Sequence, residues 1–403
     1  MRENVIVLPG TKWQIPLVQK LKRRGYRVIV LDYYENQPAY EYADEYRIVD
    51  ILDKEKVYEI AKEYSSLAVL SDECDIATPT VAWVSEKMGK PTIGMKMADL
   101  YTNKYSMRAF AKKNNFATPL YFKCFSLDEA ITVYRNYHKK MIMKPLDGNS
   151  SRGVFSINCQ QDIQNHFCES LRYSKKEKCV LLEEYIDGVE FSVDGIKIMD
   201  RYYTLSVAQK KHYKNNENLD QELIFRYQNP DYDYDLLRKT NRDYVLTSGL
   251  EFGLTHAEYK YKDGKYYLIE IGARGGGNLL SGVIDPNISG IESQECLIDW
   301  SIGRKCKESD LNYRDNYKKR CAILSFFDVG NNTGKISKIS GIEYLKNNKC
   351  IKSFYFDYSE GDTVIQVKDG GNRFGYYIAC CESLKELEKI KREVAKRVEI
   401  KFE

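Results

Sequence analysis

The chain has 403 residues, enough for two to four domains of about 100–200 residues or for one large enzyme with several lobes. Hydrophobic residues make up 43% of the chain, which excludes wholesale disorder. The 62 basic and 58 acidic residues nearly balance, and this argues against a nucleic-acid-binding protein, whose basic residues should cluster on one face.

The 11 cysteines contain no Cys-x-x-Cys pair, a pattern typical of reduced, mostly buried thiols in a cytosolic protein. The chain begins with a short apolar run, residues 5–8, and neither a signal peptide nor an apolar span of about 20 residues follows. We therefore expect a cytoplasmic protein without a membrane partner.

Short apolar strands alternate with helical patterns near the N-terminus. Strands are predicted at 5–8 and 28–31, a third short strand after residue 43 and a fourth strand at 67–70. Helices are predicted at 15–21 and 57–64. This alternation predicts parallel βαβ units. The first turn, P-G-T-K-W, lacks G-x-G-x-x-G, so no dinucleotide fingerprint is present. Asp32 is either a ribose ligand or a plain strand-end carboxylate, and loops 9–13 and 71–75 are candidates for substrate contact.

Residues 89–94 are predicted to link this part to a second one. One helix is expected at about 98–114, a strand at 121–125 and another strand at 141–144. That last strand ends in Lys144, and the sequence D-G-N-S-S-R-G-V follows at 147–154. Its glycines and serines allow backbone N–H groups and hydroxyls to surround an anion, although a plain hairpin turn would also use them.

Residues 180–195 contain an apolar strand, acidic residues and a turn at Gly188. A hinge between two lobes would expose backbone groups to an adenine ring there, and Glu190 could accept hydrogen bonds from ribose hydroxyls. A simple hairpin with exposed acids is the alternative. Both interpretations remain open at this point.

A β-hairpin is predicted from strands 254–261 and 266–271, joined by a turn at 262–265. Glu258 and Glu270 interrupt its apolar strands and can lie on the same face. Two buried carboxylates repel each other unless a cation lies between them, and oxygen ligands suit Mg²⁺. We therefore predict a magnesium site at this hairpin. His256 is expected to be a packed strand residue and not a ligand.

In order, these motifs resemble those of the ATP-grasp superfamily, over roughly residues 98–304. The matching motifs are the strand lysine with its Gly/Ser loop, the acidic hinge with G-x-E, H-x-E, and I-E-I-x-x-R-x-x-G. The resemblance implies an α/β fold with α+β lobes. It implies a Rossmann-like βαβ domain at 1–97, a two-lobed ATP-grasp domain at 98–305 with a lid at about 119–188, and a C-terminal α+β domain at 306–403.

The resemblance also implies roles for individual residues. Glu258 and Glu270 would bind Mg²⁺, with Mn²⁺ as the alternative ion, and Arg274 would stabilise charge on the transferring phosphoryl group. Of the two lysines after the hinge, Lys210 and Lys211, we favour Lys211 for catalysis. The residues expected to bind ATP are Lys104, Lys144, Gly148, Ser150, Ser151, Gly153, Val154, Glu183, Glu184, Tyr185, Ile186 and Glu190.

One position departs from the family pattern. Many members have asparagine two residues after the bridging glutamate, as a further metal ligand, and here that residue is Gly272. Either water replaces the ligand or Asn278 takes its place. The number of metal ions therefore stays open.

The resemblance implies an ADP-forming ligase that activates a carboxylate as an acyl phosphate and joins it to an amine. An amino-acid or dipeptide ligase fits the motifs. The alternatives are a phosphoribosylglycinamide-synthetase-like enzyme and an ATP-binding protein without catalysis. The expected partners are small carboxylate and amine substrates and, as in related families, a second copy of the chain; nucleic acid is not expected.

Overall fold

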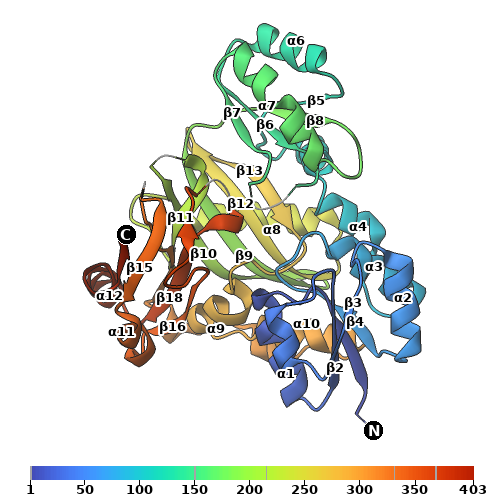
Figure 1. The fold of residues 1–403 in the computed structure, drawn as a ribbon. Helices are drawn as coiled ribbons and strands as arrows, with labels where there is room; N and C mark the ends of the chain where they lie inside the picture. Colours follow the sequence, from blue (N-terminus) through green and yellow to red (C-terminus); the bar gives the residue numbers. More distant parts are fainter. Residues whose placement is uncertain (1, 149–150, 215, 331, 368–369) are drawn as a thin grey trace.

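The computed structural model describes residues 2–148, 151–214, 216–330, 332–367 and 370–403 (Figure 1). Its first part is a parallel four-stranded sheet of order β3-β2-β1-β4. The apolar strands pack between helices on both faces, as the alternating pattern predicted. The elements are β1 Asn4–Val7, α1 Ile15–Arg23, β2 Arg27–Asp32, β3 Glu45–Ile48, α2 Lys54–Glu63, β4 Ala68–Leu70 and α3 Thr78–Lys87.

Two helices, and not the single helix expected at 98–114, follow this sheet. α4 spans Gly94–Leu100 and α5 spans Lys104–Lys113. The break falls at Asn103, whose Oδ1 accepts hydrogen bonds from the backbone N–H groups of Tyr105, at 3.0 Å, and Ser106, at 3.2 Å. This side chain is therefore an N-cap that starts a new helix. The break places Lys104 at the first position of α5.

A second four-stranded sheet, of order β5-β8-β6-β7, forms a small lobe that stands apart from the rest of the molecule in Figure 1. Its helices α6 and α7 pack against one face around a core that includes Met141, Met143 and Leu182. The elements are β5 Tyr121–Cys124, α6 Leu127–Tyr137, β6 Met141–Pro145, β7 Phe155–Ile157, α7 Gln160–Tyr173 and β8 Val180–Glu184.

An eight-stranded sheet of order β13-β12-β9-β10-β11-β14-β18-β16 forms the centre of the molecule. Strands from before and after residue 305 share it, because β11 pairs with β14. Its strands are β9 Val189–Ile198, β10 Arg201–Tyr213, β11 Asn216–Arg226, β12 Phe252–Lys262, β13 Lys265–Gly272, β14 Cys321–Phe326, β16 Ile351–Phe356 and β18 Gly375–Cys381. The helices α8 Tyr234–Ser248, α9 Asp285–Ser289 and α10 Ser293–Ser301 connect them.

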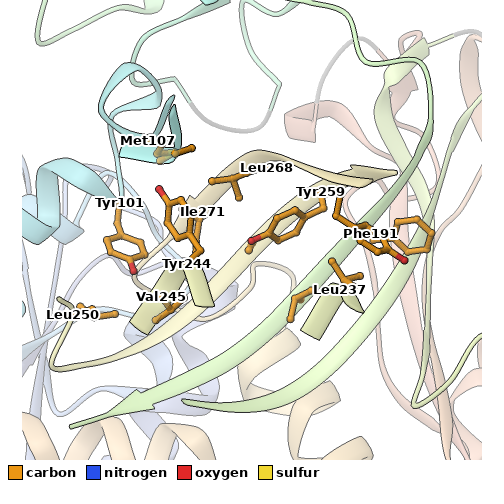
Figure 2. Close-up of a cluster of buried hydrophobic side chains, with 14 of the residues drawn as sticks. Tyr101, Met107, Phe191, Leu237, Tyr244, Val245, Leu250, Tyr259, Leu268 and Ile271 are labelled. Carbon is orange, nitrogen blue, oxygen red and sulfur yellow. The ribbon is translucent and has the colours of Figure 1, made fainter. Parts of the chain in front are cut away.

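One face of this sheet carries the aromatic core drawn in Figure 2. Tyr259 of β12 and Leu268 and Ile271 of β13 point into it, together with Tyr244 of α8. Each of these four side chains is 1% exposed or less. The polar residues between them in the sequence therefore face the opposite side of the hairpin.

The last part of the chain contains a smaller sheet, of order β17-β15-β19, and two helices. The elements are β15 Gly334–Ser340, α11 Ile342–Asn347, β17 Thr363–Val364, α12 Leu384–Arg397 and β19 Glu399–Phe402.

Cys296 and Cys306 are joined in a disulfide, which differs from the expectation of reduced thiols throughout. Among the described helices, none has both the length and the apolar character needed to cross a bilayer.

Candidate active site

A polar cleft lies between the small lobe and the central sheet. Of the predicted site residues, Ser150 lies outside the described part of the chain, and Gly153 and Arg274 are not among the residues that line this cleft. The cleft is lined by Lys104, Lys144, Gly148, Ser151, Val154, Glu183, Glu184, Tyr185, Ile186, Glu190, Glu258 and Glu270, and also by Lys210.

The predicted metal carboxylates face each other across β12 and β13, where Glu258 pairs with Glu270. A regular hairpin would not produce this pairing. Next to the turn Tyr259 lies opposite Leu268, so Glu258 would meet Ile269 in an unbroken ladder. A β-bulge at Ile269 shifts the register by one residue, and such bulges re-aim side chains beside active sites. The bulge places Glu270 on the face of Glu258.

Lysine ammonium groups already neutralise these two carboxylates. Lys104 Nζ lies 2.7 Å from Glu270 Oε1, and Lys210 Nζ donates to Glu258 Oε1. Burial opposes ionisation of Glu258, but Lys210 overrides it and holds the pKa of that carboxyl well below its usual range. Two carboxylates that lie together and attract positive charge fit a Mg²⁺ ion.

Lys210 is the centre of a buried ion network. Its Nζ lies 2.9 Å from Glu190 Oε1 and 3.4 Å from Asp220 Oδ2, besides the contact with Glu258. Burial disfavours the charged amine, but these three carboxylates raise the pKa of Lys210 well above its usual value. Burial likewise opposes ionisation of Glu190, and Lys210 lowers its pKa to about 2.

The preference for Lys211 over Lys210 was wrong. The Lys211 side chain is 61% exposed, and its amine lies 3.8 Å from Glu222. Neighbouring residues of a strand point to opposite faces, so only one of the two lysines can enter the cleft. The sequence offered no simple signal for this choice, because buried and exposed residues do not alternate regularly along β10.

Lys144 reaches the cleft from β6 through a second buried network. Its Nζ pairs with Glu183, which also receives hydrogen bonds from Arg108 Nε at 2.7 Å and Arg108 Nη2 at 3.2 Å. Burial lowers the pKa of Lys144, and Glu183 opposes that shift. Burial raises the pKa of Glu183, but the two cations lower it below its usual value. Glu183 thus orients Lys144, and Arg108, which the sequence analysis missed, orients Glu183.

The described part of the Gly/Ser loop closes one side of the cleft. Lys104 Nζ donates to the Gly148 carbonyl at 2.8 Å, so this lysine links the loop to Glu270. Gly153 has φ +71°, and a Cβ there would lie 2.7 Å from the Tyr173 ring. Gly153 is therefore needed for the shape of the loop, and it does not line the cleft itself.

The hinge residues lie where β8 leaves the small lobe. The backbone N–H of Glu184 donates to the Leu120 carbonyl at 2.9 Å, so only its carbonyl can serve an adenine ring. Ile186 is 3% exposed. The Tyr185 hydroxyl donates to Glu217 at 2.9 Å, and Lys140 Nζ lies 3.7 Å from the centre of its ring. Tyr185 therefore joins the hinge to β11.

Arg274 is held by the N-terminal part of the chain. Its Nε and Nη2 donate to the two oxygens of Asp75 at 2.8 and 2.6 Å. Asp72 accepts the Gly275 N–H at 2.8 Å, and Glu73 accepts the Leu279 N–H at 2.8 Å. The loop at 71–75, a candidate for substrate contact, thus clamps the glycine-rich loop that carries Arg274.

This clamp bears directly on Gly272. A Cβ at that position would lie 2.8 Å from Asp75 Oδ1 and 3.3 Å from Arg274 Nε. The space that an asparagine would need is therefore taken by the Asp75–Arg274 ion pair. In the part of the chain that the structure describes, Asn278 is not among the residues lining the cleft.

His256 is buried on β12, as expected for a packed histidine, but it is also ion-paired. Its Nδ1 lies 3.0 Å from Asp194 Oδ1, and its Nε2 lies 3.6 Å from Glu258 Oε1. Burial disfavours the imidazolium, but Asp194 outweighs burial and raises the pKa of His256 to about 9. The imidazolium adds positive charge beside the metal carboxylates.

Comparisons with known proteins agree with this geometry. Residues 137–282 match the family model of the ATP-grasp domain. The structure of an L-amino acid ligase from Bacillus licheniformis superposes with a TM-score of 0.81 at 20% identity, covering 100% of this chain and 99% of that one. A phosphoribosylglycinamide synthetase from Anaerococcus prevotii gives 0.76 at 18% identity, with 100% of both chains covered. The chain therefore has the ATP-grasp fold and contains an ATP-grasp domain, which confirms the predicted fold class.

Further matches are to ligases and synthases. Residues 329–403 match L-amino acid ligase C-terminal domain 2. Dapdiamide A synthase from Enterobacter agglomerans is 29% identical over 165 residues, 40% of this chain and 37% of that enzyme. A phosphoribosylamine–glycine ligase from Pyrococcus abyssi is 29% identical over 194 residues, 47% and 44% of the two chains. The chain spans about half or less of the length of these curated relatives.

Proposed function

We propose that this protein is an ATP- and Mg²⁺-dependent ligase that joins a carboxylate to an amine, of the amino-acid or dipeptide ligase type. The observation that carries the proposal is the cleft in which Glu258 and Glu270 converge with the amines of Lys104 and Lys210. The match to an L-amino acid ligase C-terminal domain supports an amino-acid substrate. The proposed unit for ATP binding is residues 98–305, with residues 1–97 and 306–403 on either side.

In the proposed reaction, a substrate carboxylate oxygen attacks the γ-phosphorus of ATP, and the bond from that phosphorus to the bridging β–γ oxygen breaks. ADP leaves, and an acyl phosphate remains. An amine then attacks the acyl carbon, the carbon–oxygen bond to phosphate breaks, and the amine nitrogen loses a proton. This sequence needs positioning and charge neutralisation, and no nucleophile from the protein.

The residues of the cleft, and Arg274, whose charge interacts with Glu258 and Glu270, have matching roles in this proposal. Lys104 and Lys144 contact the phosphates, and the hinge at 184–186 contacts the adenine. Glu258 and Glu270 would hold Mg²⁺, which neutralises charge on phosphate oxygens when it is bound. Arg274 stabilises the charge on the transferring phosphoryl group. Asp75 keeps the Arg274 guanidinium in place for this role.

The direct test is ADP release by the full chain with ATP, Mg²⁺ and pairs of amino acids, with the product identified by mass spectrometry. The proposal expects at least one pair to stimulate ADP release and to yield a condensed product. A parallel reaction with glycine and phosphoribosylamine tests the second candidate substrate pair, which the match to phosphoribosylamine–glycine ligase favours.

Gly272 favours a third candidate, an ATP-binding protein without catalysis. If this third candidate is correct, the protein binds ATP, but neither the amino-acid pairs nor glycine with phosphoribosylamine stimulates ADP release. Equilibrium binding of ATP, measured in the same samples, separates it from a protein that does not bind nucleotide.

A further inference from the structure

Three potential metal-binding side chains meet in the C-terminal part of the chain, away from the ATP cleft. Cys350 precedes β16, Cys381 ends β18, and Glu386 lies in the first turn of α12. One ligand atom from each lies within 4.8 Å of the other two. Residues separated by 31 and 5 positions in the sequence are thus brought to one point by the sheet and the helix.

The distance between two of these atoms matches that in a tetrahedral zinc site. With Zn–S bonds of about 2.3 Å and Zn–O bonds of about 2.0 Å, a tetrahedral angle places sulfur and oxygen about 3.5 Å apart. Cys350 Sγ lies 3.4 Å from Glu386 Oε1. A cation could therefore enter between these two atoms with little movement of either side chain.

Backbone hydrogen bonds fix the donors independently of one another. The Cys350 N–H donates to Asn348 Oδ1, and its carbonyl accepts from the Cys380 N–H, both at 2.9 Å. Glu386 Oε2 accepts the Glu382 N–H at 3.0 Å, which leaves Oε1 directed at the thiol. Such outer contacts orient the ligands of metal sites.

Exposure of the three residues suits a site with one open position. Cys381 is 4% exposed, whereas Cys350 and Glu386 are half-buried. Without a cation, Cys350 donates its S–H to Glu386. A metal ion would replace that hydrogen bond and release both thiol protons.

We propose that Cys350 Sγ, Cys381 Sγ and Glu386 Oε1 bind a thiophilic divalent cation, of which Zn²⁺ fits best, with water as the fourth ligand. Zn²⁺ accepts thiolate and carboxylate ligands in four-coordinate geometry. The bound ion would tie β16, β18 and α12 together. This site does not depend on the proposed ligase activity.

The test uses the full chain, freed of metal and with the Cys296–Cys306 disulfide intact, and titrates it with Cd²⁺ and then with Zn²⁺. Cd²⁺ should give an ultraviolet thiolate-to-metal absorption that saturates at one equivalent, which carboxylates of the ATP cleft cannot produce. Excess Zn²⁺ should displace the Cd²⁺ ion and remove this absorption. Cys350→Ser and Cys381→Ser should each abolish the absorption, and Glu386→Gln should weaken Zn²⁺ binding about 10-fold or more.

Cys168→Ser and Glu388→Gln are matched controls on exposed helix positions, and both should bind metal like the unmodified chain. A readout on the unmodified chain guards against misfolded variants: Zn²⁺ should protect Cys350 from alkylation, as mapped by peptide mass. The proposal is overturned if no thiolate absorption develops, if the absorption survives both cysteine substitutions, or if Zn²⁺ leaves Cys350 equally reactive.

Discussion

At the scale of single residues, the site depends on opposite charges that lie close together in a partly buried cleft. Glu258, Glu190 and Asp220 surround the amine of Lys210, and Lys104 pairs with Glu270. A carboxylate that is partly removed from water is costly without such a partner, and Lys210 lowers the pKa of both Glu190 and Glu258. The same ionised form is what a metal ion requires.

The Glu270→Ala variant removes the carboxylate that the bulge directs into the cleft. We expect ATP turnover to fall by at least about 10²-fold, because charge in the transition state loses its stabilisation. ADP release measures this, and circular dichroism checks that the fold persists. Turnover near that of the unmodified chain would show that Glu270 is not a metal ligand that catalysis needs.

Lys210→Met and Lys211→Met form a matched pair on one strand. Lys210→Met removes the cation that Glu190, Asp220 and Glu258 share, and should lower ATP turnover by about 10²-fold. Lys211→Met alters an exposed side chain and should change turnover by no more than about twofold. Equal losses in the two variants would contradict the assignment of Lys210 to the cleft.

The pairing of His256 with Asp194 predicts a pH dependence of stability. Because the folded-state pKa of His256 is raised to about 9, its stabilising contribution is complete below a pH of about 6.5 and is lost as the pH rises through about 9. Asp194→Asn should lower this pKa, which NMR titration of the imidazole measures. The difference in free energy of unfolding between the two chains should shrink over that pH range; a constant difference would argue against the ion pair.

At the scale of elements, the β-bulge of β13 connects the core to the chemistry. Tyr259, Leu268 and Ile271 pack on one face, and the bulge turns Glu270 to the other. Arg108 of α5 donates to the carbonyl of the bulged residue, Ile269, and also to Glu183. The buried guanidinium of Arg108 thus connects β13, which carries Glu270, to β8, which carries Glu183.

Arg108→Met tests this connection. It removes one partner from a buried ion network, which typically costs about 3–5 kcal/mol in the free energy of unfolding. Chemical denaturation measures that loss. Arg135→Met, on an exposed position of α6, is the control and should change stability by less than about 0.5 kcal/mol. A cost for Arg108→Met as small as that of the control would show that the network adds nothing to folding.

At the scale of the whole molecule, the site is assembled from distant parts of the chain. The loop at 71–75 holds the glycine-rich loop through Asp72, Glu73 and Asp75. The position of Arg274 therefore depends on how the N-terminal sheet packs against the central sheet. Gly272 lies at the contact between them.

Gly272→Asn restores the residue that many ATP-grasp proteins have at this position. We expect turnover to fall by about 10²-fold and not to rise, because the new Cβ would meet Asp75 and displace Arg274. Gly264→Asn is the control, since its Cβ would meet nothing within 4 Å and asparagine tolerates its positive φ. Higher turnover in Gly272→Asn would identify a missing metal ligand instead.

Local patterns in the sequence were sufficient for the alternating strands and helices of the first 70 residues, the hairpin of β12 and β13, and the order of the nucleotide-binding motifs. These features depend on residues close together in the chain, where periodicity and turn residues determine structure. They also led to Glu258, Glu270 and Lys144 as site residues, and the family resemblance added Lys104.

Only the tertiary structure decided which face of each strand enters the cleft. In a regular hairpin, Glu258 would pair with Ile269, but the bulge pairs it with Glu270 instead. Arg108, which is far away in the sequence, donates a hydrogen bond to the carbonyl of the bulged residue, Ile269. The choice of Lys210 over Lys211 and the clamp of Asp75 on Arg274 have the same origin. Ion pairs between remote segments leave no periodic signal, because their energy depends on burial and distance, which exist only once the chain has folded.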